Sequence, residues 1–189
     1  MIAGVVLAAG ASRRFGSQKL LAPVGGVPLV RRAVERLLET SLDEILVVLG
    51  SDAATVGAAL AGLNVRIVSN EAFAAGMSTS LRAGLDALRP PTEAALVALA
   101  DQPGVGAEIV DRLVARYRAS RPPIVAPLYG DGVRGNPVLF DRSIFDELRA
   151  VTGDEGGRSV VARDPRRVVL VEFAEAMPGD VDVPADLEG

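Results

Sequence analysis

Short β-branched runs alternate along this chain with stretches rich in alanine, leucine and arginine, and the alternation restricts the possible fold. The expected strands are Ile2–Ala8, Glu44–Leu49, Val65–Ser69, Ala94–Ala100, Ile124–Pro127, Asn136–Phe140 and Val168–Phe173. The expected helices are Leu29–Glu39, Ala53–Ala61, Ser78–Leu88, Ala107–Arg118, Ser143–Ala150 and Gly157–Arg163. Such alternation predicts an α/β layered fold with right-handed crossovers.

Apolar spacing supports both kinds of element. Within Leu29–Glu39 the apolar residues recur at helical spacing and share one face. The first strands are continuous apolar runs, which is typical of a parallel sheet covered on both faces. After about Arg118, proline and glycine crowd together and turns dominate. We interpret that region as an irregular lobe on the same sheet and expect residues 1–189 to form one domain.

The composition excludes several kinds of chemistry. The 189 residues include no cysteine and no histidine, which removes disulfides, thiol nucleophiles and histidine-based acid–base schemes. Any metal must therefore be held by oxygen ligands, which favours magnesium, manganese or calcium. The net charge of -4 argues against nucleic acid as a partner. No apolar run reaches the ~20 residues of a membrane span, and the N-terminus does not resemble a signal peptide, so we expect a cytoplasmic protein.

The first strand leads into the segment LAAGASRRFGSQK, which begins at Leu7 and ends at Lys19. Ligands of open α/β sheets bind beyond the carboxyl ends of the strands, so this segment is a candidate binding loop. It is neither a P-loop nor a dinucleotide fingerprint. Its glycines and cations would bring backbone N–H groups, arginine and lysine together, a combination that suits a polyphosphate. The alternative is an ordinary strand-to-helix turn with solvated arginines.

Two further strand ends carry polar residues. Asn70 follows the third strand and precedes GMSTSLRAGL, in which we expect Ser78 to cap a helix. The N–H groups of that turn could read the edge of a nucleobase, or the segment is only a capped amphipathic helix. The fourth strand ends at Asp101, the best single metal candidate. A turn or N-cap aspartate is the alternative interpretation.

The C-terminal segment GDVDVPADL supplies more carboxylates. Asp180 and Asp182 alternate, so they would face the same side of an extended segment. Together with Asp101 they would suit Mg²⁺ that bridges phosphates, unless the segment is a solvated acidic tail. The loops 134–137 and 153–158 are either surface turns or contacts to a polar second substrate.

Taken together, these segments resemble the MobA-like nucleotidyltransferases over nearly the whole chain. LAAGASRRFGSQKLL is similar to the family signature L-A-[AG]-G-x-S-x-R-x-G-x-x-K, and GMSTSL, ADQP, RGNPVLF, GDEGGR and DVDVPADL appear in the family's order. ADQP, GNPVLF and GD-x-G-x-R look most like the molybdenum-cofactor cytidylyltransferase branch. LAAG, in place of the LAGG usual in the guanylyltransferase branch, favours cytosine. Asn136 departs from the pattern, because that branch often has histidine there.

The resemblance implies a three-layer Rossmann-like nucleotidyltransferase fold with a mostly parallel central sheet. It also implies a Mg²⁺-dependent enzyme that transfers CMP from CTP to molybdopterin with release of pyrophosphate. Transient contact with molybdoenzymes or their chaperones is a further implication. The implied catalytic residues are Arg14, Lys19 and Asp101. The implied nucleotide contacts are Leu7, Ala8, Ala9, Gly10, Ser12, Arg14, Lys19, Asn70, Gly76, Ser78 and Ser80. The implied acceptor contacts are Asn136, Asp154 and Arg158, and the implied metal ligands are Asp101, Asp180 and Asp182.

Three other functions remain open at this point. The first is guanylyl or cytidylyl transfer to another phosphorylated acceptor. The second is a flavin- or nicotinamide-dependent reductase on the same scaffold, although a reductase has no need of the carboxylates at Asp101, Asp180 and Asp182. The third is a non-catalytic module that binds a nucleotide or delivers a cofactor.

Overall fold

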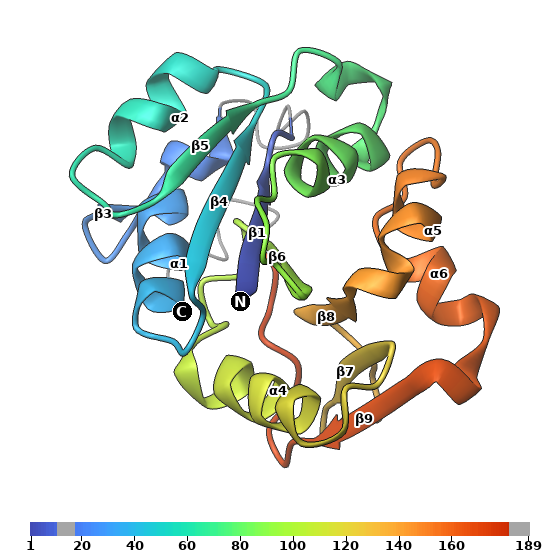
Figure 1. The fold of residues 1–189 in the computed structure, drawn as a ribbon. Helices are drawn as coiled ribbons and strands as arrows, with labels where there is room; N and C mark the ends of the chain where they lie inside the picture. Colours follow the sequence, from blue (N-terminus) through green and yellow to red (C-terminus); the bar gives the residue numbers. More distant parts are fainter. Residues whose placement is uncertain (11–17, 182–189) are drawn as a thin grey trace.

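A seven-stranded, mostly parallel sheet forms the middle layer of the molecule in a computed structural model that describes residues 1–10 and 18–181 (Figure 1). The strand order is β5–β4–β1–β6–β8–β7–β9. Only β8 runs antiparallel to its neighbours within this sheet. The strands are β1 (Ile2–Ala8), β4 (Glu44–Leu49), β5 (Arg66–Ser69), β6 (Ala94–Leu99), β7 (Ile124–Leu128), β8 (Val138–Asp141) and β9 (Val168–Glu172).

Helices cover both faces of this sheet and complete the three layers. The α-helices are α1 (Leu29–Leu38), α2 (Ala53–Ala59), α3 (Met77–Asp86), α4 (Ala107–Ser120), α5 (Phe145–Arg149) and α6 (Arg158–Arg163). Short 3₁₀ turns are η1 (Lys19–Leu21), η2 (Phe73–Ala75), η3 (Arg142–Ile144) and η4 (Pro165–Arg167). Buried residues of α1, α2 and α4 belong to one core cluster, and those of α3, α5 and α6 belong to the other. The predicted layered α/β fold is thereby confirmed.

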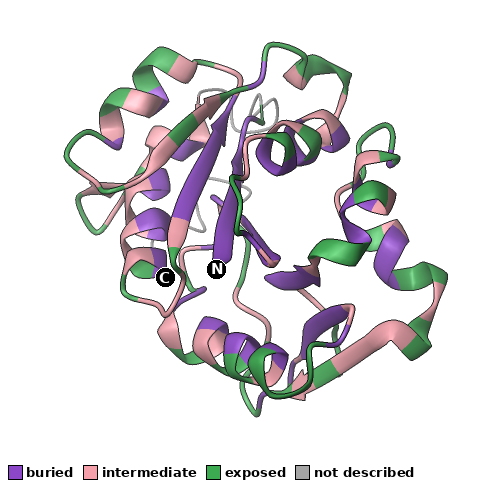
Figure 2. Ribbon diagram, viewed as in Figure 1, coloured by how far each residue is buried: buried purple, intermediate pink, exposed green. Residues whose placement is uncertain are grey.

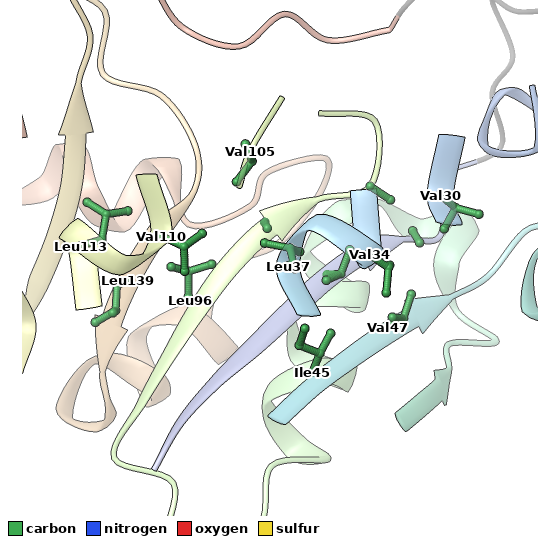
Figure 3. Packing of buried hydrophobic residues seen from close by; sticks show 14 of the residues in the cluster. Val30, Val34, Leu37, Ile45, Val47, Leu96, Val105, Val110, Leu113 and Leu139 are labelled. Atoms are coloured by element: carbon green, nitrogen blue, oxygen red, sulfur yellow. The ribbon is translucent and has the colours of Figure 1, made fainter. Parts of the chain in front are cut away.

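Strand β1 lies between the two clusters and is buried at every position, as the uniform colour of its ribbon shows (Figure 2). Val6 and Ala8 face the first cluster, while Val5 and Leu7 face the second, because successive side chains of a strand point to opposite faces. The first cluster appears in Figure 3, where side chains of α1 and α4 lie over the strands. Apolar burial on both sides explains why this strand reads as a continuous hydrophobic run.

The observed elements follow the expected ones closely. Strands β1 and β4 have the predicted bounds, and the other sheet strands begin or end within two residues of them. One predicted helix, residues 143–150, is instead a 3₁₀ turn followed by the short α5. A small hairpin of β2 (Pro23–Val24) and β3 (Val27–Pro28) was not predicted. The sequence does contain the signal for this hairpin, which is the pair Gly25-Gly26 between two valines. Both glycines have the positive φ that a two-residue hairpin turn requires.

Strand direction places the segments after several strands at one end of the sheet. Strands β1, β4, β5 and β6 are mutually parallel, so their carboxyl ends coincide. The antiparallel β8 begins at the same end, because Val138 pairs with Val97 near the carboxyl end of β6. The predicted site residues from 7–10, 70–80, 101 and 136 therefore share this end. None of the helices in the described ranges is long and apolar enough to cross a membrane.

Two helical glycines provide a test of the packing between α3 and the sheet. A Cβ on Gly84 would overlap Val5 of β1, whereas a Cβ on Gly57 of α2 would lie 3.4 Å from Leu49, an ordinary contact. We expect Gly84→Ala to lower the free energy of unfolding by about 1–3 kcal/mol through overpacking. Gly57→Ala should raise it by roughly 0.5–1 kcal/mol through helix propensity. Urea unfolding measures both, and equal stability of the two variants would contradict this packing.

Candidate active site

An ion pair between Lys19 and Asp101 lies at the carboxyl end of the sheet. Lys19 begins η1, and Asp101 follows β6. The Nζ atom of Lys19 lies 2.7 Å from Oδ2 of Asp101, and the two side chains are only 16% and 22% exposed. The other carboxylate oxygen of Asp101, Oδ1, is buried and has no hydrogen-bond partner among the described residues. A buried acceptor without a partner is costly, so this oxygen is well suited to a cation or a donor from a ligand.

The C-terminal segment returns to Asp101. The backbone N–H of Val181 donates to the carbonyl oxygen of Asp101 at 3.0 Å. The neighbouring Gln102 is buried, and its Nε2 donates to Oδ1 of Asp180 at 2.5 Å. The structure thus brings Asp180 next to the segment that carries Asp101, and a shared metal ion stays a prediction. Asp182 lies outside the described residues, and within those residues no three acidic side chains gather into a metal-binding group.

The residues at the end of β1 have small or apolar side chains, so they can offer a ligand only backbone groups for hydrogen bonding. Leu7, Ala8 and Ala9 are buried, and Gly10 is exposed. The carbonyl oxygen of Ala9 accepts from the N–H of Ser51 at 3.3 Å. A Cβ on Gly10 would meet no atom of the described residues. Ser12 and Arg14 lie outside the described residues.

The polar side chains after β5 serve the loop that holds them. Asn70 donates from Nδ2 to the hydroxyls of Thr79 and Ser80, each at 2.9 Å, and its Oδ1 accepts from the N–H of Ala72. Asn70, Ser78 and Ser80 are all buried. These bonds fasten the end of β5 to helix α3. A contact between these three side chains and a nucleotide stays a prediction.

The prediction that Ser78 caps helix α3 is wrong. The helix begins at Met77 with Gly76 as its N-cap, and Ser78 lies inside its first turn. The acceptors come instead from a distant loop, because the N–H of Met77 donates to Oδ1 of Asp154 and the N–H of Ser78 donates to the carbonyl oxygen of Gly153, both at 3.2 Å. A carboxylate at this position also stabilises the positive end of the helix dipole.

Gly76 makes this docking possible. Its φ of +112° is one that L side chains rarely adopt, and the carbonyl group of Gly153 occupies the place of its missing Cβ. Residues 153–154, predicted to face the acceptor, therefore touch the turn predicted to face the nucleotide. The two predicted subsites share a backbone contact.

The remaining predicted acceptor residues lie on two other elements. Asn136 is half-buried before β8, and its carbonyl oxygen accepts from the hydroxyl of Tyr129 at 2.6 Å. Burial raises the pKa of Tyr129 to about 12, so this hydroxyl remains a donor at neutral pH. Arg158 is exposed at the start of α6. The sequence analysis did not predict the hydrogen bonds of Gln102 and Tyr129. A signal existed for Gln102, because this polar residue follows Asp101 at the end of an apolar strand.

The fold is that of enzymes that transfer nucleotides. Residues 4–168 match the family model described as the MobA-like NTP transferase domain. The chain belongs to the MobA-like NTP transferase family, as the sequence resemblance predicts.

Curated relatives carry two kinds of name. The chain is 36% identical over 188 residues to the nicotine blue oxidoreductase of Paenarthrobacter nicotinovorans, an alignment that covers 96% of this chain and 92% of the relative. It is 31% identical over 133 residues to a probable molybdenum cofactor guanylyltransferase of Thermococcus kodakarensis. That second alignment covers 68% of this chain and 60% of the relative, so the chain matches less than two thirds of that protein's length.

Solved structures reproduce the whole fold. The homolog of Mycobacterium tuberculosis Rv0371c from Mycobacterium sp. strain JC1 is similar with a TM-score of 0.88 and 31% identity, over 99% of this chain and 93% of that one. Rv0371c of Mycobacterium tuberculosis H37Rv in complex with manganese gives a TM-score of 0.81 and 30% identity, over 99% and 96%. A structure similar to this one thus contains manganese.

Substitution of Gly76 tests the docked loop. Gly76→Ala should displace residues 153–154, because the new Cβ would collide with the carbonyl group of Gly153. Hydrogen exchange of the Met77 and Ser78 amides should then accelerate, since both lose their acceptors. Gly62→Ala is the matched control, because Gly62 also has a positive φ but no atom near its missing Cβ. Unchanged exchange at both amides in Gly76→Ala would refute the docking.

Proposed function

We propose that this chain is a Mg²⁺-dependent cytidylyltransferase that transfers CMP from CTP to molybdopterin and releases pyrophosphate. The observation that carries the proposal is the Lys19–Asp101 pair, in which the Nζ–Oδ2 distance is 2.7 Å and Oδ1 is buried without a partner among the described residues. Membership of the MobA-like family and the relatives named guanylyltransferase support nucleotide transfer and a molybdopterin-type acceptor.

The residues present suit a hard divalent cation. Asp101 offers a buried carboxylate oxygen, and the chain contains no cysteine or histidine that would favour a softer metal. Asp101, with Asp180 or Asp182, would hold Mg²⁺. When bound, the ion would reduce the negative charge on the phosphate oxygens. The manganese complex of Rv0371c, a similar structure, supports a role for a divalent ion.

The reaction would be an in-line displacement at the α-phosphorus of CTP. A phosphate oxygen of the acceptor forms the new P–O bond, and the bond to the β-phosphate oxygen breaks, so pyrophosphate leaves with the electron pair. No general base is needed, because the second pKa of a phosphate monoester is ~6 and its oxygen is already ionised near neutral pH. This agrees with a chain that has no histidine.

Lys19 and Arg14 would offset the charge that develops on the leaving pyrophosphate. Asp101 already holds the Lys19 ammonium at the end of the sheet, so little reorganisation is needed when charge develops. The backbone at Ala9 and Gly10 would lie along the triphosphate. Catalysis would then rest on positioning and electrostatics, as in phosphoryl transfer generally.

The choice of CTP rests on the LAAG sequence, and the choice of acceptor rests on the loops at 136 and 153–158. Ala9 is buried at the end of β1, beside Gly50. Residues 153–154 bond the start of α3, and this contact supports a proposal in which the acceptor loop and the base-binding turn are neighbours. Contact with molybdoenzymes or their chaperones and a cytoplasmic location stay predictions from the sequence.

A pyrophosphate-release assay tests the proposal. CTP, GTP, ATP and UTP are each combined with molybdopterin and with simple phosphorylated alcohols. We expect release with CTP and molybdopterin, and we expect EDTA to abolish it. Asp101→Asn should lower kcat by about 10²–10³, the cost of removing one group that stabilises the transition state. Asp146→Asn is the matched control, because that side chain is 97% exposed on α5.

The outcomes separate the alternatives. Release with GTP in place of CTP would keep the transferase and replace the base. Release only with another phosphorylated compound would replace the acceptor. No release with any pair, or full turnover in EDTA, would refute the proposed function.

A second candidate function is a nicotinamide- or flavin-dependent reductase. It is favoured by the 36% identity to nicotine blue oxidoreductase, which extends over 96% of the chain. The first loop would then bind the pyrophosphate of a dinucleotide rather than a triphosphate. A reductase predicts NAD(P)H oxidation in the presence of a redox dye, with little loss in Asp101→Asn. The proposed transferase predicts no such oxidation.

A further inference from the structure

Gln102 is a buried amide that links the C-terminal segment to the segment carrying Asp101. Its side chain is 2% exposed, and its Nε2 donates to Oδ1 of Asp180, which lies 78 residues later. An ionised carboxylate only accepts hydrogen bonds, so the amide nitrogen must face Asp180. This fixes the orientation of the Gln102 side chain.

The amide oxygen of Gln102 carries a free-energy cost in this arrangement. Oε1 of Gln102 is buried and accepts no hydrogen bond from the described residues. An apolar side chain of similar size would avoid that cost. The amide is therefore best explained by its donor, which serves the carboxylate of Asp180.

Three contacts hold residues 178–181 over the turn after β6. Pro178 lies so close to Gly104 that a Cβ on that glycine would approach it to 2.9 Å. The N–H of Val181 donates to the carbonyl oxygen of Asp101 at 3.0 Å, and the Val181 side chain belongs to the first core cluster. Asp180 is otherwise exposed, and its bond to Gln102 is the polar side-chain contact of the three.

The two aspartates differ in burial. Each has one carboxylate oxygen engaged, that of Asp101 by Lys19 and that of Asp180 by Gln102. The second oxygen of Asp101 is buried and has no partner among the described residues, whereas Asp180 is exposed. We infer that Asp180 is a positioning residue and not a metal ligand: Gln102 binds it and thereby holds the C-terminal segment beside Asp101. The inference rests on the proposed function, because it takes Asp101 as the metal ligand.

Binding of Mn²⁺ to the full chain, followed by the electron paramagnetic resonance signal of the free ion, tests this role. Asp180→Asn should keep its Mn²⁺ affinity within about twofold, because an amide oxygen still accepts from Gln102, whereas loss of the charge of a metal-binding carboxylate would weaken Mn²⁺ binding far more. Asp180→Ala and Gln102→Leu should each weaken Mn²⁺ binding about tenfold, as loss of an outer-shell contact does. Asp101→Asn should weaken it about a hundredfold or more.

Thermal unfolding in EDTA provides a second readout that does not involve the metal. Asp180→Ala should lower Tm, and Gln102→Leu should lower it less, because it also removes the buried Oε1 that no described residue bonds. Adding Asp180→Ala to Gln102→Leu should cause no further loss, because both substitutions remove the same contact. Additive losses would overturn the inference, as would a loss of Mn²⁺ affinity in Asp180→Asn as large as in Asp101→Asn. The proposed function would survive both results.

Failure of the metal assignment gives a different pattern. If Asp101→Asn binds Mn²⁺ as the wild type does, or if the wild type binds none, the metal site in the proposed function is wrong, and the positioning inference falls with it.

Discussion

Burial of β1 on both faces is the constraint on which the rest of the structure depends. The strand is at most 8% exposed at its apolar positions, and it separates two core clusters built by different helices. A strand in this position needs a neighbour on each side and a helix layer above and below it. Its neighbours, β4 and β6, are both parallel to it, so the chain must return through α-helical crossovers. The carboxyl ends of these strands consequently meet at one end of the sheet.

The candidate site follows from that geometry. Asp101 comes at the end of β6 and Lys19 begins η1, so the lysine and the carboxylate meet although they are 82 residues apart in sequence. A partly buried ion pair gains less than its Coulomb attraction, because both groups lose water. The ion pair therefore matters more for holding the two side chains in place than for the stability of the fold. The pair holds a cation beside a carboxylate that keeps one oxygen without a partner among the described residues, and the proposed function assigns the triphosphate to this place.

The sequence predicted those parts of the fold that depend on local patterns. The bounds of β1 and β4 were predicted correctly because each is an apolar run that ends at glycine, turn or polar residues. The start of α3 was predicted wrongly because its cap is supplied from residues 153 and 154, which no local pattern around Ser78 reveals. The bond between Gln102 and Asp180 was missed for the same reason, since it joins residues far apart in the chain. The roles assigned to Ser12, Arg14 and Asp182 concern residues outside the described ranges and stay predictions.

A crystal structure with CTP and Mn²⁺, read through the anomalous signal of manganese, tests the central claim most directly. We predict a manganese peak bonded to Oδ1 of Asp101 and in contact with the triphosphate, with the Lys19 ammonium on a phosphate oxygen. A metal peak elsewhere, or CTP bound away from the carboxyl end of the sheet, would contradict the assignment of this pair as the nucleotide-transfer centre.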